Sequence, residues 1–271
     1  MTGRQLSMIR EIDRAGDAHG QGQPGAPRQP LRGIAIERSR ISDKLVSLVA
    51  PDSYAADQYR TLRQVVERRR RENGDQVIGV TSPCPGDGKT ITALNLAGAL
   101  AQSAGARVLI IDADLRRPSV ADCLGLQRPL SPGLSEAILD STCELAAVVR
   151  SLDPFNLSVL PAGSSHSMPY ELLNSPRLEA LLRDARRQYD CVLIDTPPAV
   201  PFPDCRLIER VVDSFLLVIA AHRTPRKLVA EALNLLDPGK LVGAVFNADD
   251  QSRASAYGYY GSYYNRNRAS K

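Results

Sequence analysis

The sequence predicts an α/β fold, a three-layer sandwich in which a mostly parallel sheet carries helices on both faces. Two patterns lead to this class. Short runs of apolar and β-branched residues recur without polar alternation, which predicts strands buried on both faces. Segments of helical length separate these runs, and a repeated strand, helix, strand order is typical of parallel sheets. The expected strands are 77–81, 108–111, 157–160, 191–194, 214–220 and 241–246, and the expected helices are 53–71, 91–103, 133–139, 175–188 and 225–236.

Composition limits the class of protein. With 43% hydrophobic residues the 271-residue chain can bury a sizeable core, and its formal net charge of +4 does not call for a nucleic-acid partner. No apolar run approaches the roughly 18 residues of a membrane span, and the first residues lack the apolar core of a signal peptide. The five cysteines and three histidines are scattered without metal-ligand spacing, which favours reduced thiols. We therefore expect a cytoplasmic protein that is held at a membrane only through a partner.

Three segments of different composition divide the chain. Residues 1–40 are polar and rich in Gly, Pro, Gln and Arg, so they bury little apolar surface and are predicted to be disordered. Residues 41–250 contain the expected strands and helices and form the predicted globular domain. Residues 251–271 combine Gly, Ser and Tyr without a strand or helix pattern, which predicts a flexible tail.

The predicted helix 53–71 carries two groups of charges. Asp57, Arg60 and Arg63 follow one another at intervals of three, so they share one stripe of the helix. Residues 68–71 are four consecutive arginines. Both features are typical of a solvated charged face, and either could instead contact an acidic partner or a neighbouring subunit.

The first long apolar strand is followed by SPCPGDGKT, a loop of small residues that opens a helix. Gly86 and Gly88 allow backbone N–H groups to turn inward, and these groups form an anion site with the positive end of the helix. The loop departs from G-x-x-x-x-G-K-[ST] at its first position, where Pro83 stands. Lys89 is expected to reach the β- and γ-phosphates, and the Thr90 hydroxyl to bind Mg2+. The predicted nucleotide-binding residues are Pro85, Gly86, Asp87, Gly88, Lys89, Thr90 and Ile91.

Aspartates end two later strands. Asp112 and Asp114 follow the run VLII, and Asp195 follows CVLI. Ligands of open α/β sheets bind beyond the carboxyl ends of the strands, so these side chains are expected near the phosphate loop. They suit Mg2+ coordination or polarisation of an attacking hydroxyl, with Asp112 and Asp195 joining Thr90 as predicted metal ligands. Asn247 ends the last strand, where its amide could contact the base.

The tail holds a cluster of tyrosines interleaved with Gly and Ser. Such an aromatic tail could stack on a partner or be disordered. It could instead be a flexible arm of phosphate acceptors that reaches an active site, and each phosphorylated tyrosine would add about −1.5 to −2 charges. The candidate acceptors are Tyr257, Tyr259, Tyr260, Tyr263 and Tyr264.

In these motifs the chain resembles the bacterial tyrosine kinases (BY-kinases) of capsule and exopolysaccharide gene clusters, over about residues 52–264. SPCPGDGKT is similar to their phosphate loop, VLIIDADLRRP and CVLIDTPP to their acidic motifs, and GLSEAIL, LPAG and ELLNSPRL also follow their pattern. DQYRTLR resembles their E-x-x-R-x-x-R oligomerisation helix, with Asp57 in place of Glu. Partition-type ATPases share the fold and the aspartate motifs, but they carry an additional lysine at the position of Cys84 and lack the tyrosine tail.

The resemblance implies a P-loop NTPase-like fold and an ATP-dependent protein-tyrosine kinase that phosphorylates its own tyrosine cluster. Lys89 and the loop amides would hold the phosphates of ATP, while Thr90 and Asp195 would hold Mg2+. Asp112 would accept the proton of the tyrosine hydroxyl, and Asp114 would support the metal and the loop.

The resemblance also implies partners. The family forms rings in which one subunit's tail enters its neighbour's site, with Asp57, Arg60 and Arg63 at the junction. A transmembrane polysaccharide co-polymerase would activate the kinase at the inner membrane, and the kinase would regulate polysaccharide polymerisation and export. A partition-type ATPase switch and a nucleotide-bound adaptor without catalysis are the alternatives to this function.

Overall fold

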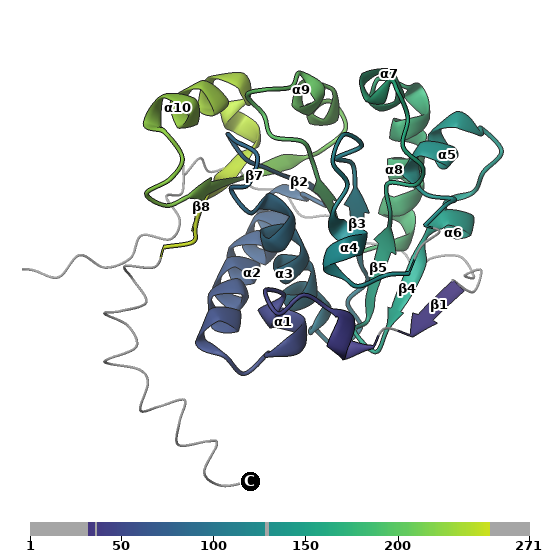
Figure 1. Cartoon of the computed structure of the whole chain (residues 1–271), viewed down its shortest axis with the longest axis horizontal. Helices are drawn as coiled ribbons and strands as arrows, with labels where there is room; N and C mark the ends of the chain where they lie inside the picture. The colour runs from purple at the N-terminus through teal and green to yellow at the C-terminus, as the bar shows by residue number, and fades with distance from the viewer. Residues whose placement is uncertain (1–31, 36, 128–129, 250–271) are drawn as a thin grey trace, which may run out of the picture.

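The computed structural model describes residues 32–35, 37–127 and 130–249, which contain one eight-stranded sheet (Figure 1). The strand order is β1-β4-β5-β3-β6-β2-β7-β8. Neighbouring strands are parallel except β4 and β5, which are antiparallel. The strands are β1 (Arg32–Ala35), β2 (Val77–Thr81), β3 (Val108–Asp112), β4 (Arg150–Asp153), β5 (Leu157–Leu160), β6 (Cys191–Asp195), β7 (Ser214–Ala220) and β8 (Leu241–Asn247).

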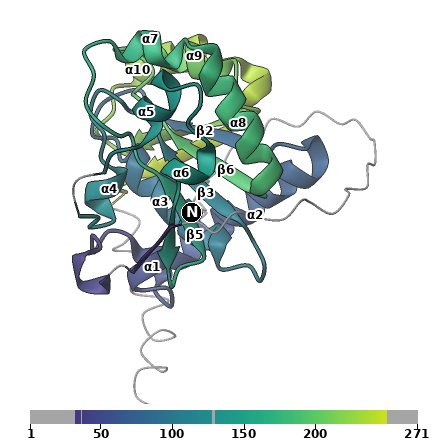
Figure 2. The same ribbon diagram turned by 90° about the vertical axis from the view of Figure 1, so that its right-hand side faces the viewer.

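Helices cover both faces of this sheet, so the predicted α/β class is confirmed. The α-helices are α1 (Val46–Val49), α2 (Tyr54–Asn73), α3 (Lys89–Ala101), α4 (Val120–Cys123), α5 (Leu134–Leu139), α6 (Leu145–Val148), α7 (Pro169–Leu173), α8 (Pro176–Gln188), α9 (Asp204–Glu209) and α10 (Arg226–Leu235). Two 3-10 helices, η1 (Arg38–Arg40) and η2 (Pro238–Lys240), complete the regular elements of the described residues. In Figure 2, α5, α7, α8, α9 and α10 lie above the strands and α1 lies below them.

The core has two halves, one on each face of the sheet. Successive residues of the central strands point to opposite faces, so Val192 and Ile194 join one apolar cluster and Leu193 joins the other. The cluster around Leu193 is closed by helices α1 to α4, and the second cluster by helices α5 to α10. Burial on both faces explains why β2, β3, β6 and β7 read as continuous apolar runs.

Helix ends follow the expected chemistry. The side chain of Ser53 accepts a hydrogen bond from the Ala56 N–H at the start of α2, and Gly74 ends that helix in the left-handed region at φ 76°. Ser175 caps α8, because its hydroxyl oxygen accepts from the Arg177 N–H.

Two predictions made from charge and composition need correction. Residues 32–35 form β1, so the predicted disordered segment 1–40 extends too far, and its first 31 residues lie outside the described ranges. The arginine run at 68–71 is not simply a solvated face. Arg69 pairs with Asp75 (3.1 Å), and Arg70 donates to the Asp190 carbonyl, so both arginines join α2 to the amino-terminal edge of the sheet.

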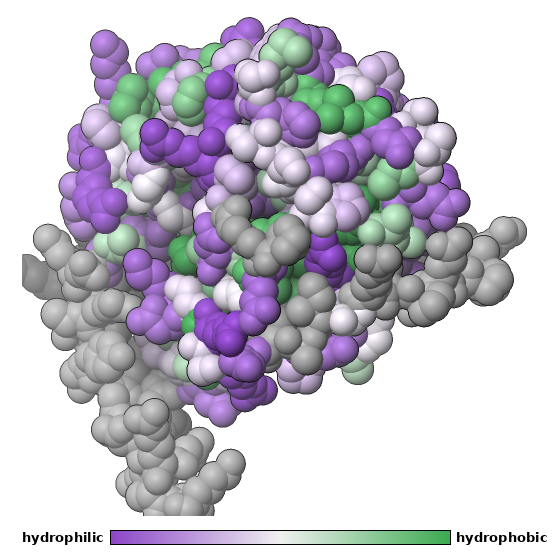
Figure 3. Space-filling view, turned by 45° about the vertical axis from the view of Figure 1, so that its right-hand side comes forward, coloured by the Kyte–Doolittle hydropathy of each residue, from purple (hydrophilic) through white to green (hydrophobic). Residues whose placement is uncertain are grey.

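The surface mixes residue types. On the face in Figure 3, hydrophilic and hydrophobic residues alternate over short distances. The exposed large apolar side chains belong to several elements, and such scattered exposure is ordinary for a folded domain. They are Leu139, Met168, Tyr170, Leu233 and Phe246. Among the residues that the structure describes, we find no helix with the length and apolarity needed to cross a membrane.

Candidate nucleotide-binding and catalytic site

The predicted site residues meet at the carboxyl edge of three adjacent strands. β6 lies between β3 and β2, and Asp112 and Asp195 are register partners across β3 and β6. Asp195 is also the partner of Val80 in β2, whose carboxyl end leads into the phosphate loop. The sheet order therefore gathers motifs that are more than a hundred residues apart in the chain.

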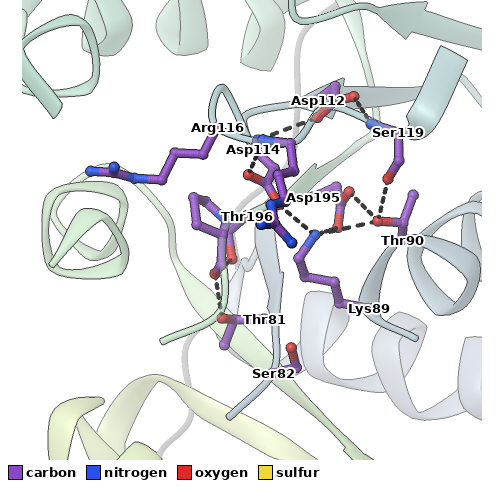
Figure 4. Close-up of polar contacts among 12 residues, drawn as sticks. Thr81, Ser82, Lys89, Thr90, Asp112, Asp114, Arg116, Ser119, Asp195 and Thr196 are labelled. Carbon is purple, nitrogen blue, oxygen red and sulfur yellow. Dashed lines mark hydrogen bonds and ion pairs between the residues drawn. The ribbon is translucent and has the colours of Figure 1, made fainter. Parts of the chain in front are cut away.

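Lys89 and Thr90, the first residues of α3, contact these aspartates (Figure 4). The Lys89 ammonium lies 2.8 Å from Asp114 Oδ2 and 3.6 Å from Asp195 Oδ1. The Thr90 hydroxyl donates to Asp195 Oδ2 (2.6 Å) and lies 3.0 Å from the Ser119 hydroxyl. Lys89 thus points into the cluster of carboxylates, on the side of the loop where phosphates are expected.

Asp112 and Asp114 also organise the loop that follows β3. Asp112 Oδ2 accepts from the backbone N–H groups of Ser119 and Val120, each at 3.0 Å, and Oδ1 accepts from Asp114 N at 3.2 Å. Asp114 Oδ1 accepts from Arg117 N at 3.0 Å, which leaves Oδ2 for Lys89. Both carboxylates are therefore fixed in orientation by backbone donors.

The site holds more negative than positive charge. Burial, reinforced by the charge of Asp195, raises the pKa of Asp112 well above its usual value. Burial also raises the pKa of Asp195 to about 6, although Lys89 and the Thr90 hydrogen bond oppose this. Burial alone would lower the pKa of Lys89, but Asp195 and Asp114 outweigh it, so the ammonium is held charged. An additional cation would relieve the excess of carboxylate charge.

The donor set fits Mg2+. Asp195 Oδ1 is buried, accepts no hydrogen bond, and has the Lys89 ammonium only at an ion-pair distance of 3.6 Å. Mg2+ is commonly bound by one or two carboxylates, a hydroxyl and substrate phosphates rather than by an all-protein cage. That agrees with the described residues, which contain no group of three or more His, Cys, Asp or Glu side chains arranged around a metal position.

The phosphate loop has the backbone conformation that its glycines predict. Gly86 and Gly88 have φ of 84° and 95°, in the left-handed region that favours glycine. A Cβ added to Gly88 would lie 2.0 Å from Asn247 Nδ2, so this position also lacks space for a side chain. Asn247 donates from Nδ2 to the Asp87 carbonyl (2.9 Å), which places its amide against the phosphate loop. Contact of Asn247 with a base stays a prediction.

One contact in this region could not be found from sequence. The Arg116 guanidinium makes a double contact with Asp204 at 2.6 and 3.0 Å and lies 4.4 Å from the centre of the Phe202 ring. Asp204 is fully buried in the first turn of α9. The pair joins the loop after β3 to the loop after β6. Arg116 stands beside the acidic motif, but nothing in the local sequence identifies a partner 88 positions away.

The predicted oligomerisation residues lie on one helix, as their spacing requires. In α2, Asp57 and Arg60 form an ion pair. Arg63 contacts Glu67 (2.7 Å) and donates to the Ala99 carbonyl of α3 (3.0 Å), so it contributes to helix packing within the chain. Their role between subunits stays a prediction. The predicted acceptor tyrosines, 257–264, lie outside the described residues.

Comparison with known proteins decides the family. A family model described as an AAA domain matches residues 75–221. The tyrosine-protein kinase YwqD of Bacillus subtilis is 35% identical over 226 residues, which cover 83% of this chain and 94% of YwqD. The chain belongs to the bacterial tyrosine kinase family. This family assignment confirms the resemblance seen in the motifs.

Two further comparisons show how much of a kinase domain and how much of a longer kinase this chain covers. The kinase domain of the Escherichia coli tyrosine kinase ETK superposes with a TM-score of 0.70 at 28% identity, covering 81% of this chain and 82% of that domain. The tyrosine-protein kinase wzc of Salmonella typhimurium is 31% identical over 84% of this chain, but the match covers only 31% of wzc. The chain therefore corresponds to the kinase part of such longer relatives.

Proposed function

We propose that this protein is an ATP-dependent protein-tyrosine kinase, which transfers the γ-phosphoryl group of ATP to a tyrosine hydroxyl. The observation that carries the proposal is the convergence of Lys89, Thr90 and the aspartates at the mouth of the phosphate loop, in a chain of this family. Phosphoryl transfer asks a protein mainly for positioning and charge neutralisation, and this arrangement supplies both.

Each residue has a defined task in this proposal. The inward N–H groups of the loop and the Lys89 ammonium bind the phosphate oxygens, and Lys89 exchanges carboxylate partners for phosphate. Thr90, Asp195 and Asp112 would hold Mg2+, which neutralises phosphate charge when bound. Asp112 accepts the proton of the tyrosine hydroxyl, a task that suits a carboxylate whose pKa burial has raised well above its usual value.

The remaining predictions complete the proposal. Asn247, beside the phosphate loop, contacts the adenine base. The acceptors are the tyrosines at 257–264 of a neighbouring subunit in a ring, and the helix stripe Asp57, Arg60 and Arg63 contacts that neighbour. A transmembrane co-polymerase activates the kinase, which regulates export of a polysaccharide.

The decisive experiment is an anti-phosphotyrosine blot of purified protein incubated with Mg-ATP. We expect a signal from the wild type and a loss of about 100-fold or more in Lys89→Ala, as for removal of a group that stabilises transferring charge. Lys227→Ala removes an exposed lysine of α10 and serves as the matched control. A signal that persists in Lys89→Ala would contradict the proposal.

A second variant separates the acceptor from the enzyme. Replacing the five tail tyrosines by phenylalanine should abolish autophosphorylation, while that variant should still phosphorylate the Lys89→Ala protein in trans. Loss of both reactions would place the acceptors elsewhere or make the tail necessary for catalysis. An ATPase switch is the second candidate, because the family model that matches residues 75–221 is described only as an AAA domain. It predicts phosphate release without phosphotyrosine.

A further inference from the structure

Thr224, which no sequence motif identified, makes a hydrogen bond to Asp87 of the phosphate loop. The Thr224 hydroxyl donates to Asp87 Oδ1 at 2.8 Å, and Asp87 Oδ2 accepts from Cys84 N at 2.9 Å. Asp87 is 4% exposed, so its carboxylate has little access to water and depends on these donors. Thr224 therefore supplies one of the two hydrogen bonds that keep a buried loop carboxylate in place.

The direction of the Thr224 hydrogen bond is fixed by the chemistry of its two partners. The backbone N–H of Ala220, the last residue of β7, donates to the Thr224 hydroxyl oxygen at 3.0 Å. An amide N–H can only donate and an ionised carboxylate can only accept, so the hydroxyl oxygen accepts from Ala220 and its single proton is donated to Asp87. The end of a buried strand thus orients the hydroxyl that holds the loop.

Two further contacts join the same region of the loop to the ends of β7 and β8. Arg223 Nη2 donates to the Gly86 carbonyl (3.2 Å), and Asn247 Nδ2 donates to the Asp87 carbonyl (2.9 Å). The two strand ends are themselves joined, because Ala221 N donates to Asn247 O at 2.7 Å. We call Arg223, Thr224 and Asn247 the brace.

The backbone around the brace is strained. His222 and Ala248 have φ of 60° and 57°, in the left-handed region that non-glycine residues seldom adopt. Each lies next to a brace residue. Conformations of this kind are kept where the surrounding structure determines them, and they concentrate at functional sites.

We propose that Thr224 is a positioning residue for nucleotide binding, which acts through Asp87 to hold the phosphate loop in its binding conformation. The inference rests on the proposed function only in taking the loop as a site for nucleoside di- and triphosphates. Gly86 and Gly88 give the loop many accessible conformations, and its N–H groups converge in few of them. Apparent affinity falls in proportion to the population of the binding-competent state, so a loop without the brace should bind nucleotide more weakly.

The test compares Thr224→Val with Thr224→Ser by calorimetric titration with Mg-ADP and Mg-ATP. Valine keeps the shape and removes the hydroxyl, whereas serine keeps the hydroxyl. We expect affinity for both nucleotides to fall about tenfold in Thr224→Val and to stay within about twofold of wild type in Thr224→Ser, as for loss of one charge-assisted hydrogen bond. In kinase assays the KM for ATP should rise while the KM for an acceptor peptide stays constant.

Several results would overturn the inference. Wild-type affinity in a folded Thr224→Val protein would do so, and so would equal losses in the valine and serine variants, because shape rather than the hydroxyl would then matter. If Thr224→Val unfolds at the assay temperature, Asp87→Asn carries the same test. The side-chain amide of the Asp87→Asn variant has one acceptor oxygen for two donors, the Thr224 hydroxyl and the Cys84 N–H. Unchanged nucleotide affinity in Asp87→Asn would therefore overturn the inference. Phosphotyrosine is not part of the titration, so failure of the kinase proposal would be recognised separately.

Discussion

At the carboxyl ends of β3 and β6, Asp112, Asp114 and Asp195 converge on Lys89, whereas at the amino-terminal edge of the sheet Asp190 and Asp213, which precede β6 and β7, each bind an arginine. Asp190 accepts from the backbone N–H of Arg107 as well as pairing with its guanidinium.

Asp213 accepts hydrogen bonds from both an arginine side chain and the backbone of two residues. It binds both terminal nitrogens of Arg186 (2.6 and 2.8 Å) and accepts from the backbone N–H groups of Gln76 and Val77. The aspartates at the carboxyl edge thus share one cation, Lys89, whereas each of these two aspartates has an arginine to itself.

The difference is visible in proton affinity. The Arg107 hydrogen bond lowers the pKa of Asp190, and at Asp213 the effect of burial is outweighed by Arg186 and two backbone donors, so that pKa is lowered too. At the carboxyl edge the pKa values of Asp112 and Asp195 are raised. Carboxylates that each pair with an arginine stabilise the fold, and those that share a single lysine are available to a metal ion or ligand.

The largest expected effect comes from changing Asp195, the most buried of the site carboxylates. Asp195→Asn should reduce phosphotyrosine formation about 100-fold or more, because the uncharged amide is a poor Mg2+ ligand. The same variant should be more stable than wild type at pH 7 without nucleotide, because the raised pKa means that the ionised form is unfavourable in the fold. Kinase assays and urea denaturation measure the two effects.

A smaller and opposite effect is expected at the amino-terminal edge. Asp213→Asn should lower the free energy of unfolding by about 1–3 kcal/mol, because it removes a charged acceptor from Arg186 and two backbone donors. The kcat of the folded variant should stay within about twofold of wild type, since Asp213 lies at the opposite edge from the site.

An exposed ion pair provides the control for Asp213. Arg183→Gln breaks the 3.4 Å contact with Glu179 on the surface of α8 and should change stability by less than about 0.5 kcal/mol. If Asp213→Asn has no larger effect than Arg183→Gln, the proposed contrast between the edges is wrong.

The smallest expected effect is a pH dependence that separates the two edges. The folded pKa of Asp195 is raised to about 6, so the destabilising ionised form disappears as pH falls through that value, and Asp195→Asn should lose its stability advantage between about pH 7 and 4. Asp190 and Asp213 have lowered pKa values, so their stabilising contribution is complete above about pH 4 and is lost as pH falls further. Urea denaturation without Mg2+ from pH 3 to 7 checks both; a constant difference between Asp195→Asn and wild type would contradict the first.

Local patterns in the sequence determined the elements on which the site is built. The apolar runs of β2, β3 and β6, the glycines of the phosphate loop and the aspartates at the strand ends all lie within short stretches, and the structure places each of these elements where its pattern predicts. The pattern of apolar residues did not predict β1 and β4, because polar residues interrupt it in both of these four-residue strands. A strand of this length is specified mainly by its neighbours in the sheet.

The tertiary structure decided which side chains meet. Asp87 and Thr224 are 137 positions apart, and Arg70 reaches Asp190 across 120 positions, so no local pattern contains either pair. Arg63, Arg69 and Arg70 looked like solvated surface because each has a partner outside α2, in Ala99, Asp75 and Asp190. The sequence by itself determined a phosphate loop with acidic strand ends. The non-sequential strand order β3-β6-β2-β7 then decided which carboxylates share Lys89 and which residues hold the loop, because hydrogen bonds and charges act over a few ångströms of space, whatever the separation along the chain.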